Sequence, residues 1–167
     1  ETNGPRLWDS LMAMAEIGAT ANGGSSRLAL TDEDAAGRAL FVKWAEAEGL
    51  SISRDAIGNL FARRAGHEDV PPVVIGSHLD TQPKGGRFDG VLGVLAALEA
   101  VRTLNENEIE TRAPIEIANW TNEEGTRFAP AMLSSGVFAG MHTQDWANDR
   151  TDAEGKRFGD ELTRIGW

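Results

Sequence analysis

One imidazole and two carboxylates lie close together in the sequence, within residues 73–90. This stretch begins with three β-branched residues, which are typical of a buried strand. His78 and Asp80 follow at alternate positions, so their side chains point to the same side of the chain, and Asp89 stands where the next helix begins. Because α/β sheets place their sites at the carboxyl ends of strands, this pattern predicts a functional site here.

A second apolar segment, residues 115–120, is followed by two neighbouring glutamates, Glu123 and Glu124. Both can serve one site only if the backbone turns after the strand, since neighbouring strand residues point to opposite faces, and Gly125 permits such a turn. Nitrogen and oxygen donors without sulfur suit zinc, manganese, cobalt or nickel. We therefore predict a metal-dependent hydrolase, in which one glutamate binds metal and the other accepts a proton from an activated water molecule.

Each of these residues also has a simpler interpretation. His78 could be a hydrogen-bonding residue in a glycine-containing loop, Asp89 could be the N-cap of the following helix, and the two glutamates could form a solvated acidic turn. Capping and metal binding by Asp89 are compatible with each other. We do not expect metal binding by His67, which lies in a polar turn, or by His142, which has no carboxylate nearby at a useful spacing.

The composition argues against several classes of partner. The chain has 26 acidic and 16 basic residues and a formal charge of −10, without a basic stripe, so we expect neither a nucleic acid nor a membrane as partner. The absence of cysteine excludes disulfides and thiolate metal sites. The longest apolar run, residues 91–98, is too short to span a bilayer, and no secretory leader is recognisable, so we expect a cytoplasmic protein.

Helical and strand patterns alternate along the chain, and 167 residues suffice for one domain with a substantial core. This alternation predicts an α/β fold, a layered sheet with flanking helices. A hairpin is expected where the first two strands follow each other closely. We expect helices near residues 7–18, 31–49, 90–104, 129–139 and 158–165, and strands near residues 50–54, 59–63, 73–75 and 115–120.

Two runs, GSHLDTQPKGGRFDG and NWTNEEGTRF, resemble the amidase, hydantoinase and carbamoylase branch of the M20 metallopeptidase family. The runs SRLALTDEDAAGR and SSGVFAG extend the resemblance through almost the whole chain. Within this branch the sequence is most similar to the N-carbamoyl-L-amino-acid amidohydrolases, with allantoate amidohydrolases and β-ureidopropionases as near relatives. The resemblance implies part of a di-metal catalytic domain of the zinc exopeptidase type.

The resemblance also implies a role for each candidate residue. His78 would bind one of two divalent metal ions, Zn²⁺ or alternatively Mn²⁺, Co²⁺ or Ni²⁺. Asp89 would bridge both ions and Glu124 would bind the second. Glu123 would be the general base, and Asp80 would orient His78. A cis peptide bond is implied between Asp89 and the glycine that follows it.

The activity implied is cleavage of the carbamoyl C–N bond of an N-carbamoyl-L-amino acid. The alternatives within the branch are ureides such as allantoate or N-carbamoyl-β-alanine, and a dipeptidase or aminoacylase activity is a more distant one. Members of the family carry two further metal-binding histidines, and a lid and dimerisation domain through which a homodimer is expected. Residues 1–167 would then be the N-terminal part of the catalytic domain. We expect this part to be inactive alone, and a non-catalytic piece that assembles with a partner chain remains the alternative.

Overall fold

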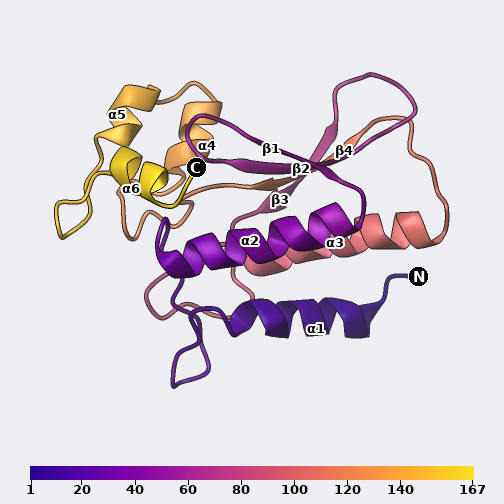
Figure 1. Ribbon diagram of the computed structural model, residues 1–167, viewed down its shortest axis with the longest axis horizontal. Helices are drawn as coiled ribbons and strands as arrows, with labels where there is room; N and C mark the ends of the chain where they lie inside the picture. The colour runs from indigo at the N-terminus through magenta and orange to yellow at the C-terminus, as the bar shows by residue number, and fades with distance from the viewer.

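Four strands form one mixed sheet in the computed structural model, which describes residues 1–167 (Figure 1). In spatial order the sheet runs β1-β2-β4-β3, with antiparallel pairing of β1 with β2 and of β2 with β4. The other pair, β3 and β4, is parallel. The expected hairpin is confirmed as β1 and β2. The strands are β1 (Ser51–Arg54), β2 (Leu60–Arg64), β3 (Val73–Ser77) and β4 (Ile115–Asn119).

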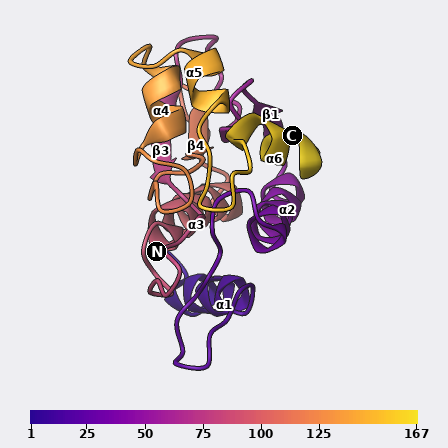
Figure 2. The same cartoon turned by 90° about the vertical axis from the view of Figure 1, so that its left-hand side faces the viewer.

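Helices cover one face of the sheet in two layers. The helices α2 and α3 lie along the sheet, and α1 packs on the outer side of α3, an order that is visible in both views (Figures 1 and 2). The short helices α4, α5 and α6 gather at one end of the sheet (Figure 1). The helices are α1 (Gly4–Ala15), α2 (Asp32–Ala47), α3 (Val91–Glu106), α4 (Leu133–Phe138), α5 (Gln144–Asn148) and α6 (Phe158–Arg164).

The predicted α/β layers are therefore confirmed, with differences at the ends of elements. Helix α5 was not expected, because its five residues are too few for a helical pattern to be recognised. The start of α2 is as predicted: Thr31 accepts a hydrogen bond from the backbone N–H of Asp34 and caps the helix. None of the helices combines the length and apolar composition that crossing a bilayer would require.

The expected burial of β3 is wrong for this structure. This strand lies at the edge of the sheet, where Val73 is 56% exposed and Val74 is 49% exposed. A run of β-branched residues indicates a strand, but it does not say how many neighbours the strand has. Here β3 pairs only with β4, and α3 packs against it from one side.

Two apolar clusters hold the layers together. The larger lies between the sheet and the helices α1, α2 and α3, and includes Phe41, Leu60, Leu98 and Ile117. The smaller lies under α4, α5 and α6, and consists of Leu30, Ile57, Phe128, Leu133, Ala147, Phe158 and Leu162. The smaller cluster holds the C-terminal segment against the loop that precedes α2, so it supports the polypeptide that follows β4.

The importance of the larger cluster can be tested within α3. Leu98 is fully buried, whereas Leu92 in the same helix is 45% exposed. Leu98→Ala is expected to lower the free energy of unfolding by about 2–5 kcal/mol, through lost burial and a cavity. The matched change Leu92→Ala should cost less than about 1 kcal/mol, since less apolar surface is lost. Urea unfolding of both variants measures the difference, and equal costs would contradict the observed packing.

Candidate metal centre

His78 leaves the end of β3 with its imidazole ring held in one orientation. The residue is 6% exposed, and its Nδ1 atom lies 2.8 Å from the backbone carbonyl oxygen of Asp80. A carbonyl oxygen can only accept, so Nδ1 carries the hydrogen in this contact and donates it. In the neutral ring Nε2 then has a free lone pair, which is the form in which histidine binds metal.

Asp89 stands immediately before α3, and Gly90 makes the turn into the helix. Gly90 has a φ of 68°, and a Cβ atom at this position would lie only 2.4–2.5 Å from ring atoms of His78. Glycine is therefore required for the loop to pass the imidazole. The expectation of a cis bond between Asp89 and Gly90 is wrong: the cis peptide bond of the chain joins Ala129 and Pro130, and the turn depends on the positive φ of Gly90.

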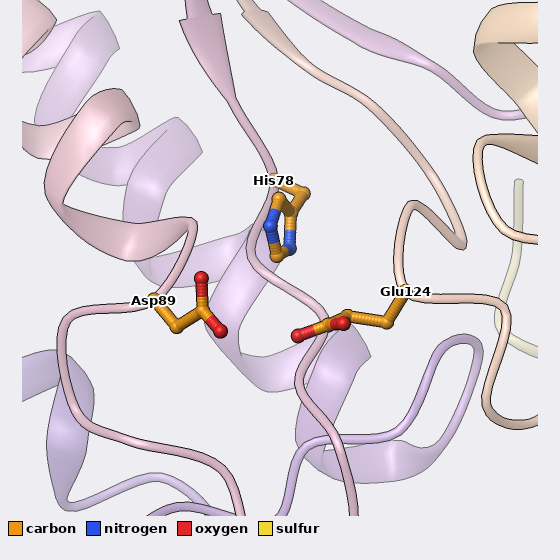
Figure 3. Close-up of side chains that lie close together, drawn as sticks. All are labelled: His78, Asp89 and Glu124. Carbon is orange, nitrogen blue, oxygen red and sulfur yellow. The ribbon is translucent and has the colours of Figure 1, made fainter.

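The alternative interpretation of Asp89 as a helix cap is not supported. The N-cap residue of α3 is Gly90, and no side chain makes a capping hydrogen bond at this helix. The Asp89 carboxylate is instead directed toward His78 and Glu124 (Figure 3).

The turn after β4 brings both glutamates to the same site. Asn122 and Gly125 adopt positive φ values of 55° and 66°, and a Cβ atom on Gly125 would lie 2.2 Å from the backbone nitrogen of Ala131. The chain thus leaves the strand geometry that would place Glu123 and Glu124 on opposite faces. The turn that the glycine was predicted to permit is present.

Three potential ligands converge at the end of the parallel strand pair. One donor atom each from His78, Asp89 and Glu124 lies within 4.8 Å of the other two (Figure 3). Donor atoms bind zinc at about 2.0–2.2 Å, so two donors to one ion lie at most about 4.4 Å apart. A small closure of these side chains therefore suffices to hold a divalent cation. The mixture of imidazole nitrogen and carboxylate oxygen fits zinc, manganese, cobalt or nickel.

Glu123 lies beside this group without being part of it. Its Oε2 atom is 3.3 Å from Nε2 of His78, and about one third of its side chain is exposed. A carboxylate in this position is next to the potential ligands and still accessible from solvent. The two neighbouring acids therefore occupy different positions, as two different roles require.

The carboxylate of Asp80 makes a contact that the sequence did not predict. Its two oxygens accept hydrogen bonds from the backbone N–H groups of Glu123 (3.2 Å) and Glu124 (3.3 Å). The Oδ1 atom is 3.8 Å from Nδ1 of His78, so the closer contact to the ring comes from the Asp80 carbonyl oxygen. Asp80 thus contacts His78 through its backbone and the glutamate turn through its side chain.

Burial, reinforced by the negative charge of nearby Asp34, raises the pKa of the Asp80 carboxyl to about 6. His78 and the two backbone N–H groups oppose this rise. Burying this carboxylate in its charged form therefore costs free energy. Its hydrogen bonds to the glutamate turn offset part of this cost.

Sequence reasoning missed other residues that shape the site. Gln82 donates a hydrogen bond from Nε2 to Oε2 of Glu124 at 3.1 Å, and Gly90 provides the space for the imidazole ring. Both lie in the run that carries His78, so its unusual glycine content was the available signal. The other histidines lie elsewhere: His142 packs on Trp146 with ring centroids 4.7 Å apart, and His67 lies in an exposed bend.

Comparison with known proteins identifies related enzymes. The model of peptidase family M20/M25/M40 matches residues 74–157, about half of the chain. An N-carbamoyl-L-amino-acid amidohydrolase of Rhizobium meliloti is 62% identical over 166 residues, 99% of this chain and 40% of that protein. An enzyme of the same name from Geobacillus stearothermophilus is 40% identical over 164 residues, 98% of this chain and 40% of its own length.

The fold agrees with these matches. The crystal structure of a hydantoinase/carbamoylase family amidase from Burkholderia ambifaria superposes with a TM-score of 0.98 at 60% identity, over 99% of this chain and 41% of that one. The chain thus spans about 40% of the length of these relatives. It belongs to peptidase family M20/M25/M40 and, within it, to the hydantoinase/carbamoylase amidase branch.

Proposed function

We propose that the complete protein is a metal-dependent amidohydrolase that cleaves the carbamoyl C–N bond of N-carbamoyl-L-amino acids. One water molecule is consumed, and the products are the free amino acid, carbon dioxide and ammonia. Residues 1–167 are proposed to form the N-terminal part of its catalytic domain. The observation that carries this proposal is the convergence of His78, Asp89 and Glu124, with Glu123 beside them. The names of two relatives that match almost the whole chain support the choice of substrate class.

In this proposal His78 would hold one metal ion, Glu124 would hold a second, and Asp89 would be a ligand shared by both. When bound, the ions supply Lewis acidity, which polarises the carbamoyl oxygen and makes a water molecule easier to deprotonate. Three side chains cannot complete the coordination of two ions, so the remaining ligands come from outside residues 1–167. The native metal is one that accepts nitrogen and oxygen donors, and zinc is the first candidate.

Glu123 is proposed to be the general base. It removes a proton from the attacking water molecule and delivers a proton to the departing nitrogen, so that no charged amide anion has to leave. Two features support this role: its carboxylate lies 3.3 Å from Nε2 of His78, and its side chain is partly open to solvent. Asp80 is proposed to be a positioning residue, since it contacts the backbone of both glutamates.

The separate roles of the two glutamates can be tested in the full-length protein. Glu123→Gln should leave the metal content nearly intact and lower kcat by ~10²-fold or more, the scale expected for losing a general base. Glu124→Gln should lower metal content and activity together, because a neutral amide is the poorer ligand. Metal analysis is therefore needed beside kinetics. An empty site in Glu123→Gln and a full one in Glu124→Gln would require the roles to be exchanged.

The role of Asp80 predicts a different pattern. In Asp80→Asn the amide nitrogen would face one of the two backbone N–H groups and could not accept its hydrogen. We expect metal affinity to fall by ~10–100-fold, as is usual for groups that orient ligands. Titration of the metal-free full-length protein with Co²⁺ measures this change, and the exposed Asp145→Asn serves as the control. Unchanged affinity in Asp80→Asn would remove the proposed positioning role.

The substrate class requires a direct comparison. The full-length enzyme should hydrolyse N-carbamoyl-L-amino acids faster than allantoate, N-carbamoyl-β-alanine or a dipeptide, measured as kcat/KM under one set of conditions. A chelator should abolish the activity, and added metal should restore it, because the proposed reaction depends on the ions. If only a dipeptide is cleaved, the carbamoylase proposal fails. If a ureide is hydrolysed faster than the N-carbamoyl-L-amino acids, the protein is a ureidase instead.

A further inference from the structure

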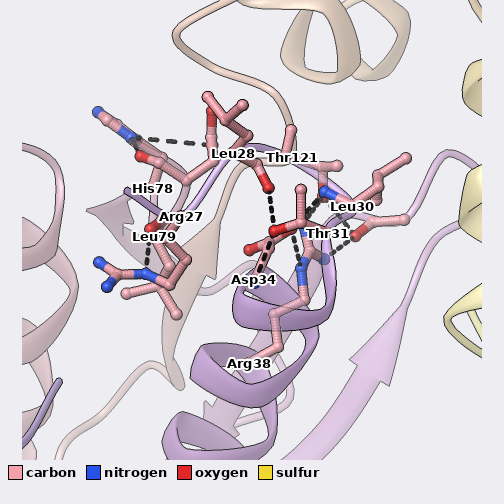
Figure 4. A network of polar contacts seen from close by, with 12 residues as sticks. Arg27, Leu28, Leu30, Thr31, Asp34, Arg38, His78, Leu79 and Thr121 are labelled. Atoms are coloured by element: carbon pink, nitrogen blue, oxygen red, sulfur yellow. Dashed lines mark hydrogen bonds and ion pairs between the residues drawn. The ribbon is translucent and has the colours of Figure 1, made fainter. Parts of the chain in front are cut away.

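Buried side chains of the run SRLALTDEDAAGR make hydrogen bonds to the segment after β3 and to the segment after β4 (Figure 4). We propose that the residues Arg27, Asp34, Arg38 and Thr121, here called the arginine network, set the distance and orientation between these two segments. Arg27 and Arg38 are then positioning residues for the metal centre, although neither touches it. The inference rests on the proposed function, because it concerns residues assigned there to metal binding.

Arg27 holds the loop that follows β3. Its side chain is fully buried, and Nε donates a hydrogen bond to the carbonyl oxygen of Leu79 at 2.9 Å, between His78 and Asp80 in the chain. Its backbone N–H donates to Oγ1 of Thr81 at 2.7 Å, and the backbone N–H of Thr81 donates to the carbonyl oxygen of Arg27 at 2.9 Å. Three hydrogen bonds thus hold the segment that carries the imidazole.

The same guanidinium group is anchored to α1 and its C-terminal turn. Nη1 donates to the carbonyl oxygens of Met14 (3.2 Å) and Ile17 (2.8 Å). These groups belong to the end of the helix, where backbone carbonyls have no partners within the helix. Arg27 therefore connects the loop after β3 with a helix of the outer layer, and its donors lie in directions that a lysine could not match.

A glycine in α2 makes room for this arrangement. A Cβ atom on Gly37 would lie 2.9 Å from Cδ of Arg27, closer than such atoms pack in proteins. Glycine inside a helix costs about 0.5–1 kcal/mol relative to alanine. The glycine in the middle of α2 thus has a specific reason, which is the passage of the Arg27 side chain.

Arg38 holds the polypeptide that leads to the glutamates. Its Nη2 atom donates to Oγ1 of Thr121 at 2.8 Å, and Thr121 is two residues before Glu123. Its Nη1 atom donates to the carbonyl oxygen of Gly58 at 3.0 Å, and the Thr121 hydroxyl donates to the same oxygen at 2.6 Å. Both side chains are buried, so water cannot replace these contacts.

Asp34 anchors Arg38 to the turn that follows Arg27 in the chain. Its Oδ2 atom accepts from Nε of Arg38 at 3.0 Å and from the backbone N–H of Leu30 at 2.8 Å. The turn between Arg27 and α2 is closed by Thr31, whose backbone N–H and hydroxyl both donate to the carbonyl oxygen of Leu28. The two arginines are thus connected through residues 28–34 of the chain and not by a direct hydrogen bond.

The burial of this network contrasts with the exposure of two of the potential ligands. The side chains of Asp89 and Glu124 are not buried, so their own packing does little to fix them. Metal ligands must be held within a fraction of an ångström of their binding geometry. For side chains that are not buried, this positioning has to come from the backbone segments that carry them. The arginine network supplies fixed points on the loop of His78 and, through Thr121, on the loop of Glu124.

Substitutions that disturb the network without touching the metal residues test the inference in the full-length protein. Thr121→Val removes the hydroxyl and leaves Nη2 of Arg38 without its partner, whereas Thr121→Ser retains the hydroxyl. Gly37→Ala displaces Arg27 without deleting a hydrogen-bonding group. The matched control is Arg102→Met, which removes a buried arginine that contacts Ser10 in α1 from the far half of α3.

The readouts are the Kd for Co²⁺ of the metal-free protein, followed by absorption of the bound ion, and the midpoint of thermal unfolding without metal. Thr121→Val and Gly37→Ala should weaken Co²⁺ binding by ~10–100-fold, the range typical of groups that orient ligands. Thr121→Ser should restore binding close to wild type. Arg102→Met should lower the unfolding midpoint while leaving the Kd near its wild-type value.

Three results would overturn the inference. Thr121→Val and Gly37→Ala could bind Co²⁺ like the wild type, or Arg102→Met could weaken binding as much as they do. In either case the arginine network contributes only to stability, and the proposed function is unaffected. If the wild-type protein itself bound no Co²⁺, the proposed metal centre would fail, and the inference that rests on it would fail with it.

Discussion

The parallel pairing of β3 with β4 is the interaction on which the site depends. Ser77 at the end of β3 is paired with Asn119 at the end of β4, so both strands stop at the same edge of the sheet. His78 follows one strand directly, and the glutamate turn follows the other. Helix α3 makes the crossover between them, and the loop that leads into it places Asp89 at the same edge. One pairing thus gathers groups that are separated by up to 46 residues in the chain.

Concentrating carboxylates at this edge has an electrostatic cost. Asp80, Asp89, Glu123 and Glu124 lie around one imidazole, and Asp80 is almost completely buried. Like charges at short range repel, and a divalent cation is the partner that such a group would need. The buried arginines Arg27 and Arg38 contact backbone and buried groups rather than the exposed carboxylates. The outer carboxylates are thereby left available for a ligand.

The C-terminal segment supports the site from the other side. The backbone N–H of Met132 donates to the carbonyl oxygen of Glu123 at 2.7 Å, just before α4. Arg127 anchors this segment through Asp152 (3.1 Å), Glu161 (2.7 Å) and the carbonyl oxygen of Ala29 (2.8 Å). Because these partners come from distant parts of the chain, the turn that carries the glutamates is held between two anchored regions. Its geometry is a property of the whole layer and not of the turn alone.

Much of this protein could be predicted from local patterns. Thr31 and the acids after it mark the start of α2, glycines mark the turns at the site, and the alternation of helix and strand predicts the α/β layers. The candidate residues His78, Asp89, Glu123 and Glu124 were recognisable because their types and their positions after strands are local features. Helix starts, turns and strand ends depend on residues that are close together in the chain, so they can be predicted from the sequence.

Tertiary structure decided the rest. The edge position of β3, the hydrogen bonds from the glutamate turn to the Asp80 carboxylate and the reach of Arg27 to Leu79 all join residues that are far apart in sequence. The sequence by itself identified the chemical groups and the elements that carry them. The packing of the layers decides which backbone amide or carbonyl forms a hydrogen bond with each buried side chain. A buried polar group needs a hydrogen-bond partner, and only the fold determines which partners lie close enough.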